Sequence, residues 1–105
     1  MALKPLTTDE RARARDKATA ARTVRADAKT RLKTGNSSVA SVIDSGSADE
    51  AIGRMKVSEM LESLPGVGKK RSAAIMAEVG ISPSRRIRGL GVHQRKALID
   101  YLTTH

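Results

Sequence analysis

Two glycines and three adjacent cations lie in the segment 64–71, whose sequence is LPGVGKKR. The run is typical of the start of a helix, where the first backbone N–H groups have no internal acceptor and the helix dipole is positive. Glycine has no Cβ, so an anion can approach such N–H groups closely. Lys69, Lys70 and Arg71 add full charges on the same turn and oppose the helix dipole. The segment therefore predicts an anion site, with phosphate as the natural ligand.

Two common phosphate loops do not fit this segment. A nucleotide-binding P-loop needs glycine where Ser63 stands and serine or threonine where Lys70 stands. The dinucleotide fingerprint needs a third glycine where Arg71 stands and a preceding strand, which the sequence does not predict. A turn that holds a nucleic-acid backbone phosphate remains. The alternative is an ordinary Pro-Gly turn between helices with solvated lysines.

The charge of the chain favours a polyanion as partner. The 105 residues hold 20 Lys and Arg against 11 Asp and Glu, a net charge of +9. Residues 1–34 hold ten cations and four acids, residues 35–55 one cation and three acids, and residues 56–105 nine cations and four acids. Two basic blocks joined by a slightly acidic connector predict two contact surfaces.

Composition excludes several other classes. Without cysteine the chain has no disulfide or thiolate metal site, and we expect no metal or cofactor and a cytoplasmic location. No apolar run approaches the roughly 20 residues that span a bilayer, and the start lacks a secretion signal, so no membrane partner is expected. Tyr101 is the single aromatic residue, which argues against base stacking on single strands and requires an aliphatic core.

The elements that position the anion segment all read as helices. Residues 8–33 predict one long helix of nearly 40 Å at about 1.5 Å per residue, stopped at Gly35. A thin stripe on it, formed by Ala14, Ala18, Ala21, Val24, Ala28 and Leu32, can dock against other helices. The basic helix is interpreted as an arm along a polyanion or, alternatively, as a solvated helix whose charges aid solubility.

The remaining residues predict a compact helical domain. Short helical pieces are expected at 37–47, ending at the Ser-Gly-Ser of 45–47, and at 48–52. Periodicity then predicts a helix from Lys56 to Leu64, ended by Pro65-Gly66, a helix over 72–79 with Val79 buried, turns at 81–84 and 85–91, and a last helix. The fold class is all-α, divided as 1–34 basic helix, 35–55 connector and 56–105 binding module.

Residues 64–102 resemble the helix–two-turns–helix module of bacterial ribosomal protein S13 and of formamidopyrimidine-type DNA glycosylases. The whole chain is similar to the actinobacterial integration host factor family, through the start MAL, PLT at 5–7, the Ala/Arg helix, IGRMKV at 52–57, LESLPGVGK at 61–69 and RIRGLG at 86–91. The resemblance implies a nucleoid-associated protein that binds duplex DNA with little sequence preference and alters its shape or topology. Two departures are the extra cation Lys70 and Val92-His93, which gives the last helix no usual cap.

Binding is expected to use two phosphate clamps on one scaffold, with backbone and shape favoured over base reading. Pro65 and Pro83 are apolar projections that could wedge against a minor groove, or simply turn-formers. The predicted DNA-binding residues are Pro65, Gly66, Val67, Gly68, Lys69, Lys70, Arg71, Ser82, Ser84, Arg85, Arg86 and Arg88. The expected partner is double-stranded DNA in the nucleoid, without a small-molecule substrate, and the free chain is expected to be monomeric.

Other functions compete with this hypothesis. An enzyme is disfavoured because the glycosylases that share the module need a catalytic domain, and because His93 and His105, the two histidines, read as surface residues. Glu59 and Glu62 read as an ion-pair face near Lys56. The main alternative is an S13-like protein that binds structured RNA, although the chain has no long basic tail after the last helix. A helical interaction protein whose charge aids solubility is the third class.

Overall fold

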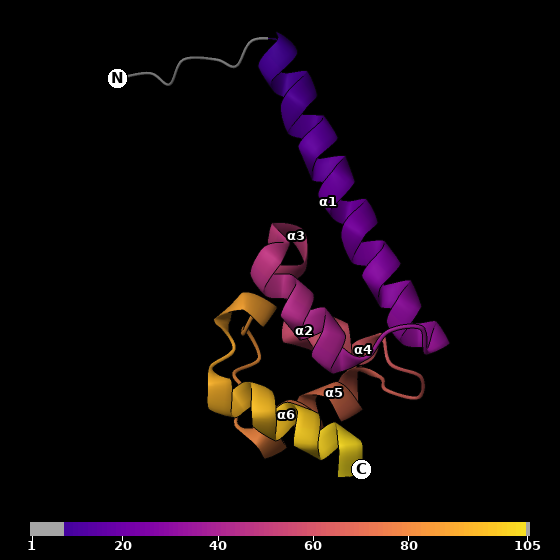
Figure 1. Ribbon diagram of the computed structural model, residues 1–105, viewed down its shortest axis with the longest axis vertical. Coiled ribbons are helices and arrows are strands. Elements are labelled where there is room, and N and C mark those ends of the chain that lie inside the picture. The colour runs from indigo at the N-terminus through magenta and orange to yellow at the C-terminus, as the bar shows by residue number, and fades with distance from the viewer. Residues whose placement is uncertain (1–7, 105) are drawn as a thin grey trace.

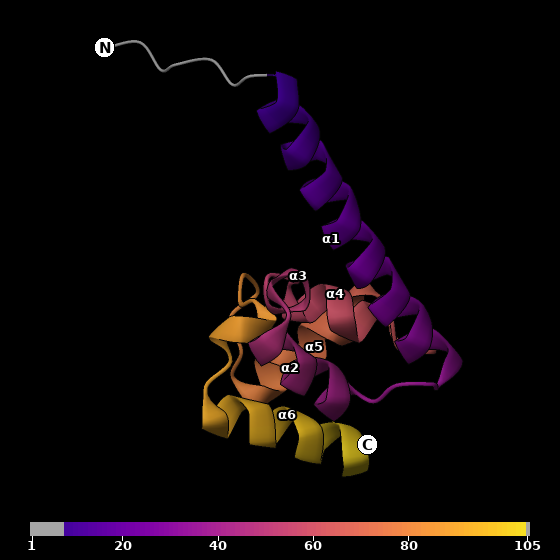
Figure 2. The ribbon, with the colours of Figure 1, turned by 45° about the horizontal axis from the view of Figure 1, so that its top comes forward.

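The computed structural model describes residues 8–104, and the fold over that range is all-α, as predicted. One isolated bridge, between Lys56 and Arg86, is the extent of strand pairing among those residues. The elements are α1 (Thr8–Thr34), α2 (Val39–Ala48), α3 (Glu50–Gly53), α4 (Val57–Glu62), α5 (Lys69–Val79), the 3₁₀ helix η1 (Ile87–Gly89) and α6 (Val92–Thr104). Figures 1 and 2 show α1 as a long rod that leans on a compact group formed by the others.

The second half of α1 supplies the buried contacts with that group, whereas Ala14 and Lys17 of the first half line a hollow beside α3. Ala28 and Leu32 are buried and Val24 packs against the core, whereas Ala14 and Ala18 of the predicted stripe are exposed. The free half projects beyond the compact group in Figure 1. The helix ends as predicted, at Gly35, whose φ of +81° is the left-handed conformation that glycine adopts without strain.

The predicted end of the second helix at 45–47 is wrong. The Ser38 side chain accepts the Ser41 N–H at 3.1 Å to begin α2, which then continues through Gly46 to Ala48. Asp49 separates α2 from α3 and caps α3 by accepting the Ala51 N–H at 2.9 Å. Gly46 is buried, and a Cβ there would lie 2.6 Å from Cγ2 of Ile87. The glycine therefore serves a close approach between elements and does not break the helix.

The helices that flank the anion segment differ from the prediction by small shifts. Helix α4 ends at Glu62, two residues early, because the chain tightens and the Leu64 N–H donates to the Leu61 carbonyl at 3.0 Å. Helix α5 begins at Lys69 and ends as predicted at Gly80, with φ +73°. Val79 is half-buried, where full burial was predicted.

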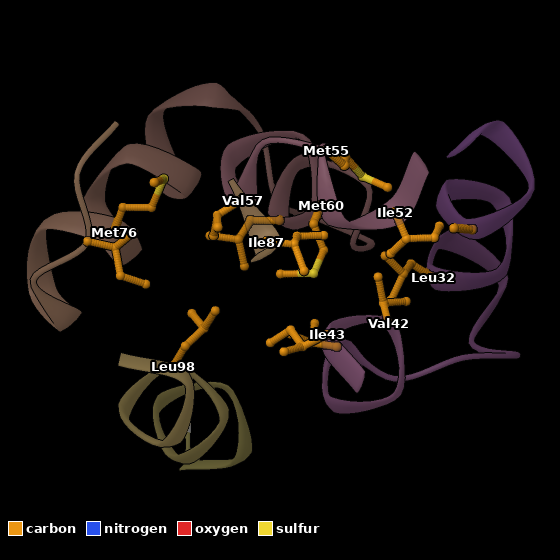
Figure 3. Close-up of a cluster of buried hydrophobic side chains, with 14 of the residues drawn as sticks. Leu32, Val42, Ile43, Ile52, Met55, Val57, Met60, Met76, Ile87 and Leu98 are labelled. Carbon is orange, nitrogen blue, oxygen red and sulfur yellow. The ribbon is translucent and has the colours of Figure 1, made fainter. Parts of the chain in front are cut away.

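The core is aliphatic, as the composition requires, and joins α1 to the compact group (Figure 3). Leu32 of α1 is 1% exposed and Leu98 of α6 is fully buried, so the first and the last helix both contribute side chains to the core. Its buried members are Ala28, Leu32, Val39, Val42, Ile43, Ile52, Met55, Val57, Met60, Leu61, Ile75, Met76, Ile81, Ile87 and Leu98.

Backbone hydrogen bonds fix the segment after α5 against the start of α4. The Val57 N–H donates to the Arg85 carbonyl at 3.0 Å, and the Ile87 N–H donates to the Met55 carbonyl at 2.9 Å. The residues before α4 thus hold the later turn, and the end of α4 leads into the anion segment. One short helix therefore positions both turns.

Candidate nucleic-acid interface

The first turn comprises residues 64–68 and leaves its glycine backbone open. Gly66 has φ +76°, and a Cβ built at Gly66 or Gly68 would meet no atom within 4 Å. The Val67 N–H is engaged within the turn, since it donates to the Leu64 carbonyl at 3.1 Å. An anion can therefore reach the glycine backbone, whereas the Val67 amide serves the turn itself.

Helix α5 begins directly after this turn with no internal cap. Gly68 occupies the cap position and offers no side-chain acceptor, and the first turn of α5 holds no acidic residue. The first closing bond is from the Ser72 N–H to the Gly68 carbonyl, at 2.9 Å, so the N–H groups of the three preceding residues have no helical acceptor. The side chains of Lys69, Lys70 and Arg71 are exposed and form no ion pair among residues 8–104.

Two lysines of α1 extend the positive charge around the first turn. Lys29, Lys33 and the turn line a hollow of about 550 Å³, together with one acidic residue, Glu62. Lys29 pairs with Glu59 of α4 at 3.3 Å, which ties the arm to the compact group, whereas Lys33 is exposed. Neither lysine is among the site residues that the sequence predicts. Their place in the last turns of α1, which Leu32 docks onto the core, is the signal that could have found them.

The second turn comprises residues 82–89 and forms a polar basin of about 300 Å³. The hydroxyl oxygens of Ser82 and Ser84 lie 3.2 Å apart, and both side chains are exposed. The basin is lined by Ser82, Ser84, Arg85, Arg86, Arg88 and Gly89. The structure thus brings together five predicted site residues of the second turn.

The three arginines of the second turn differ in orientation. Arg85 folds back, and its Nη1 donates to the Gly89 carbonyl at 3.2 Å while its Nε is buried without an acceptor. Arg86 reaches the Arg54 carbonyl through its Nη1 at 2.5 Å. Arg88 is exposed and has no polar partner in the described part of the chain. Arg88 is therefore the most available of the three for an external anion.

A small hollow, also lined by the carboxylate-bearing Glu62, lies between the start of α5 and the second turn. Lys69 follows the first turn and Pro83 lies in the second, and both line the same hollow of about 260 Å³ between α4 and α5. The apolar side chains of Met76 and Ile81 form part of its wall. The hollow therefore brings the start of α5 next to the second turn.

The start of α6 is capped by the side chain of Gln94. Gln94 Oε1 accepts the Gly91 N–H at 3.2 Å, and its Nε2 donates to the Gly80 carbonyl at 3.2 Å. This arrangement resembles half of a capping box, with the side chain of the third helical residue reaching back to the cap. Both ends of the Gln94 amide are thus used to join α5 to α6.

The acidic and histidine side chains of residues 8–104 do not gather into a metal site. That range contains no group of three or more His, Asp and Glu residues that could hold a metal ion. His93 is exposed at the start of α6, and Glu59 is the ion-pair partner of Lys29. His105 lies outside the described residues. Within the described range, no helix is both long and apolar enough to cross a bilayer.

Comparison with known proteins gives a consistent assignment. A family model described as the S13-like H2TH domain matches residues 32–102. The chain is 51% identical to "Integration host factor" of Mycobacterium tuberculosis, with 95% of each chain covered. It is 55% identical to the Streptomyces coelicolor protein of the same name, over 93% of this chain and 92% of that one.

A solved structure agrees with the sequence matches. "Structure of sIHF bound to an 8bp palindromic DNA" matches with a TM-score of 0.80 and 52% identity, over 82% of this chain and 97% of that one. The sequence matches and the solved structure point to the same relatives, and the family model gives the domain type that residues 32–102 share. This chain therefore belongs to the actinobacterial integration host factor family.

Proposed function

We propose that this chain is a nucleoid-associated protein that binds double-stranded DNA through backbone phosphates, with little dependence on base sequence. The observation that carries the proposal is the hollow that Lys69 and Pro83 both line, because it brings the uncapped start of α5 next to the second turn. The relative solved with an 8-bp palindromic DNA supports the choice of ligand.

The first turn supplies an uncapped helix N-terminus to one phosphate. Backbone N–H groups at Gly68 and Lys69 can donate to phosphate oxygens, because no side chain caps α5 and the glycine surface is open. The side chains of Lys70 and Arg71 then neutralise neighbouring phosphates. Lys33, across the adjoining hollow, adds charge to the same region.

The second turn supplies the other clamp. Arg88 donates to a phosphate from its exposed position, and the hydroxyls of Ser82 and Ser84 are further donors beside it. Arg85 and Arg86 hold the turn in shape through their carbonyl partners and add charge behind it. Two phosphate sites at a fixed separation recognise the spacing of phosphates across a groove, and they do not recognise the bases.

Sequence preference is expected to be weak, since the amide of Gln94 is engaged within the fold. Pro65 and Pro83 are exposed beside the two clamps and can press against a minor groove. If a duplex is held at two fixed points while a proline presses into its minor groove, it must bend, and the free energy of bending depends on the flexibility of its sequence. We therefore propose that binding bends the duplex or alters its topology, without catalysis.

A salt titration tests the polyelectrolyte part of the proposal. If four to seven phosphates are neutralised, the logarithm of the binding constant falls against the logarithm of salt concentration with a slope of roughly −4 to −6. Fluorescence anisotropy with a labelled 20-bp duplex at several salt concentrations measures this slope. A nearly flat plot would show that the cationic turns do not contact phosphates.

The same assay separates DNA from the ribosomal-type alternative. A structured RNA hairpin of equal length is titrated at equal salt, together with an unrelated duplex of similar flexibility. We expect tighter binding to both duplexes than to the hairpin, and similar affinities for the two duplexes. Tighter binding to the hairpin would replace the proposal with an S13-like function.

Arg85 and Arg88 are expected to respond differently to alanine substitution. Arg88→Ala removes an exposed donor, so we expect several-fold weaker binding, a salt slope smaller by about one, and unchanged stability. Arg85→Ala removes the bond to the Gly89 carbonyl and is expected to cost about 1 kcal/mol of unfolding free energy. Urea unfolding measures the stability of both variants, and anisotropy measures their affinity for the duplex. If Arg85→Ala leaves stability unchanged and lowers the salt slope more than Arg88→Ala does, then Arg85 contacts phosphate and Arg88 does not.

A further inference from the structure

The basin of the second turn has the features of a phosphate cradle next to an exposed nucleophile. Its lining carries two serine hydroxyls and three guanidinium groups and holds no acidic side chain. Ser82 and Ser84 lie 3.2 Å apart at their hydroxyl oxygens. The basin of about 300 Å³ therefore combines modifiable oxygens with cations that would hold a dianion.

A second observation marks the basin as incomplete. Arg85 Nε is buried and donates to no acceptor among the described residues, although the same guanidinium donates to Gly89 through Nη1. A buried donor left without an acceptor is costly, and a charged acceptor is the partner that compensates it best. Because Arg85 also lines the basin, an anion held there would lie beside this guanidinium.

The backbone of the turn presents Ser84 to the outside. The Arg85 N–H donates to the Ser82 carbonyl at 3.0 Å, and Pro83 occupies the second position of this β-turn. Ser84 therefore lies in the third position of a tight turn, where its side chain is exposed. An exposed turn of this kind can enter the cleft of a modifying enzyme without unfolding the domain.

We infer that Ser84 is a phosphorylation site, and that the phosphoserine occupies the basin and weakens the binding of DNA. The inference rests on the proposed function, because it assigns the second clamp a built-in competitor. A serine protein kinase and a nucleoside triphosphate are the co-reactants. The hydroxyl oxygen of Ser84 forms a bond to the γ-phosphorus, and the bond from that phosphorus to the bridging oxygen breaks. The nucleoside diphosphate leaves with the electron pair, and the hydroxyl proton passes to the kinase's catalytic base.

The modification acts through charge at the point where DNA phosphate is expected. A phosphoserine carries about −1.5 to −2 charges at neutral pH and three acceptor oxygens. It would offset about half to two thirds of the charge of Arg85, Arg86 and Arg88, and the nearby Ser82 hydroxyl can donate to it. The first turn is untouched, so binding weakens without being abolished.

The test compares two singly phosphorylated full-length chains made by translational incorporation of phosphoserine, one at position 84 and one at position 41. Ser41 is exposed on α2, outside both turns, and adds the same charge. Duplex affinity and salt slope are measured by anisotropy, and stability by urea unfolding. We expect phosphorylation at Ser84 to weaken binding about tenfold or more and lower the slope by about two, and phosphorylation at Ser41 to weaken it no more than about threefold.

Each other outcome has a definite meaning. Equal weakening by both phosphoserines would reduce the effect to overall charge and overturn the inference. Unchanged binding by the chain phosphorylated at position 84 would overturn the inference but not the proposed function, provided that the unmodified chain binds the duplex. No binding by the unmodified chain would overturn the proposed function itself. Finally, intact-mass and peptide analysis of the chain purified from its own cells should find phosphate on Ser84, and consistent absence across growth stages would also overturn the inference.

Discussion

Replacing Lys69, Lys70 and Arg71 together with alanine is expected to weaken binding to every duplex by about tenfold or more and to lower the salt slope by about two or three. The side chains are exposed and unpaired among residues 8–104, so they are available to phosphates and contribute little to the fold. Helix content should not fall, because alanine propagates helices well. Anisotropy and circular dichroism measure the two effects.

A matched control removes the same charge from the free half of α1. Arg11, Arg13 and Lys17 are exposed there and are also replaced with alanine. The control should lose less affinity than the first-turn variant at equal salt. If the control loses more, α1 is the main binding surface and the first turn is only a connection between helices.

The substitution Gly53→Ala is expected to lower the unfolding free energy by about 2–3 kcal/mol, within the range for overpacking. A Cβ at this position would lie 2.6 Å from the Gly46 carbonyl oxygen and 3.2 Å from Cβ of Arg88. Backbone cannot move aside as a flexible side chain can, so α2 and α3 must separate and disturb the second turn. For a domain of this size, the loss corresponds to a fall in Tm of more than about 10 °C.

Gly68→Ala is the control for that substitution. A Cβ at Gly68 meets nothing within 4 Å, and its φ of −94° suits any residue. We expect its stability to fall by less than about 1 kcal/mol, as for a change of helix cap. Urea unfolding measures the unfolding free energy of both variants. If both variants lose the same amount, the contact between α2 and α3 does not require a residue without a side chain at position 53.

Local signals in the sequence predict much of this fold. The helix over 8–33 has strong helix formers throughout, and the glycines at 35 and 80 end helices in the left-handed conformation because no other residue adopts it as readily. The same reasoning fails at Gly46, because the pattern Ser-Gly-Ser is typical of a helix end, whereas α2 continues through it. Its contact with Ile87 depends on a residue 41 positions later, which local pattern does not report.

The candidate site was predictable in outline only. Adjacent glycines and cations mark the first turn, and the cluster of arginines marks the second. The sequence does not show which arginine folds inward, because the acceptors of Arg85 and Arg86 are backbone carbonyls fixed by the tertiary fold. Lys33 likewise joins the first turn only because Leu32 docks α1 onto the core.

The central claim is that the two turns together hold one duplex, and backbone ¹H–¹⁵N chemical shifts of the full chain test it most directly. A short duplex is added stepwise at low salt, and each amide is followed. We expect the largest changes at residues 66–71 and 82–89, both saturating at the same DNA concentration. Changes confined to residues 8–20 of α1, with both turns unaffected, would contradict it.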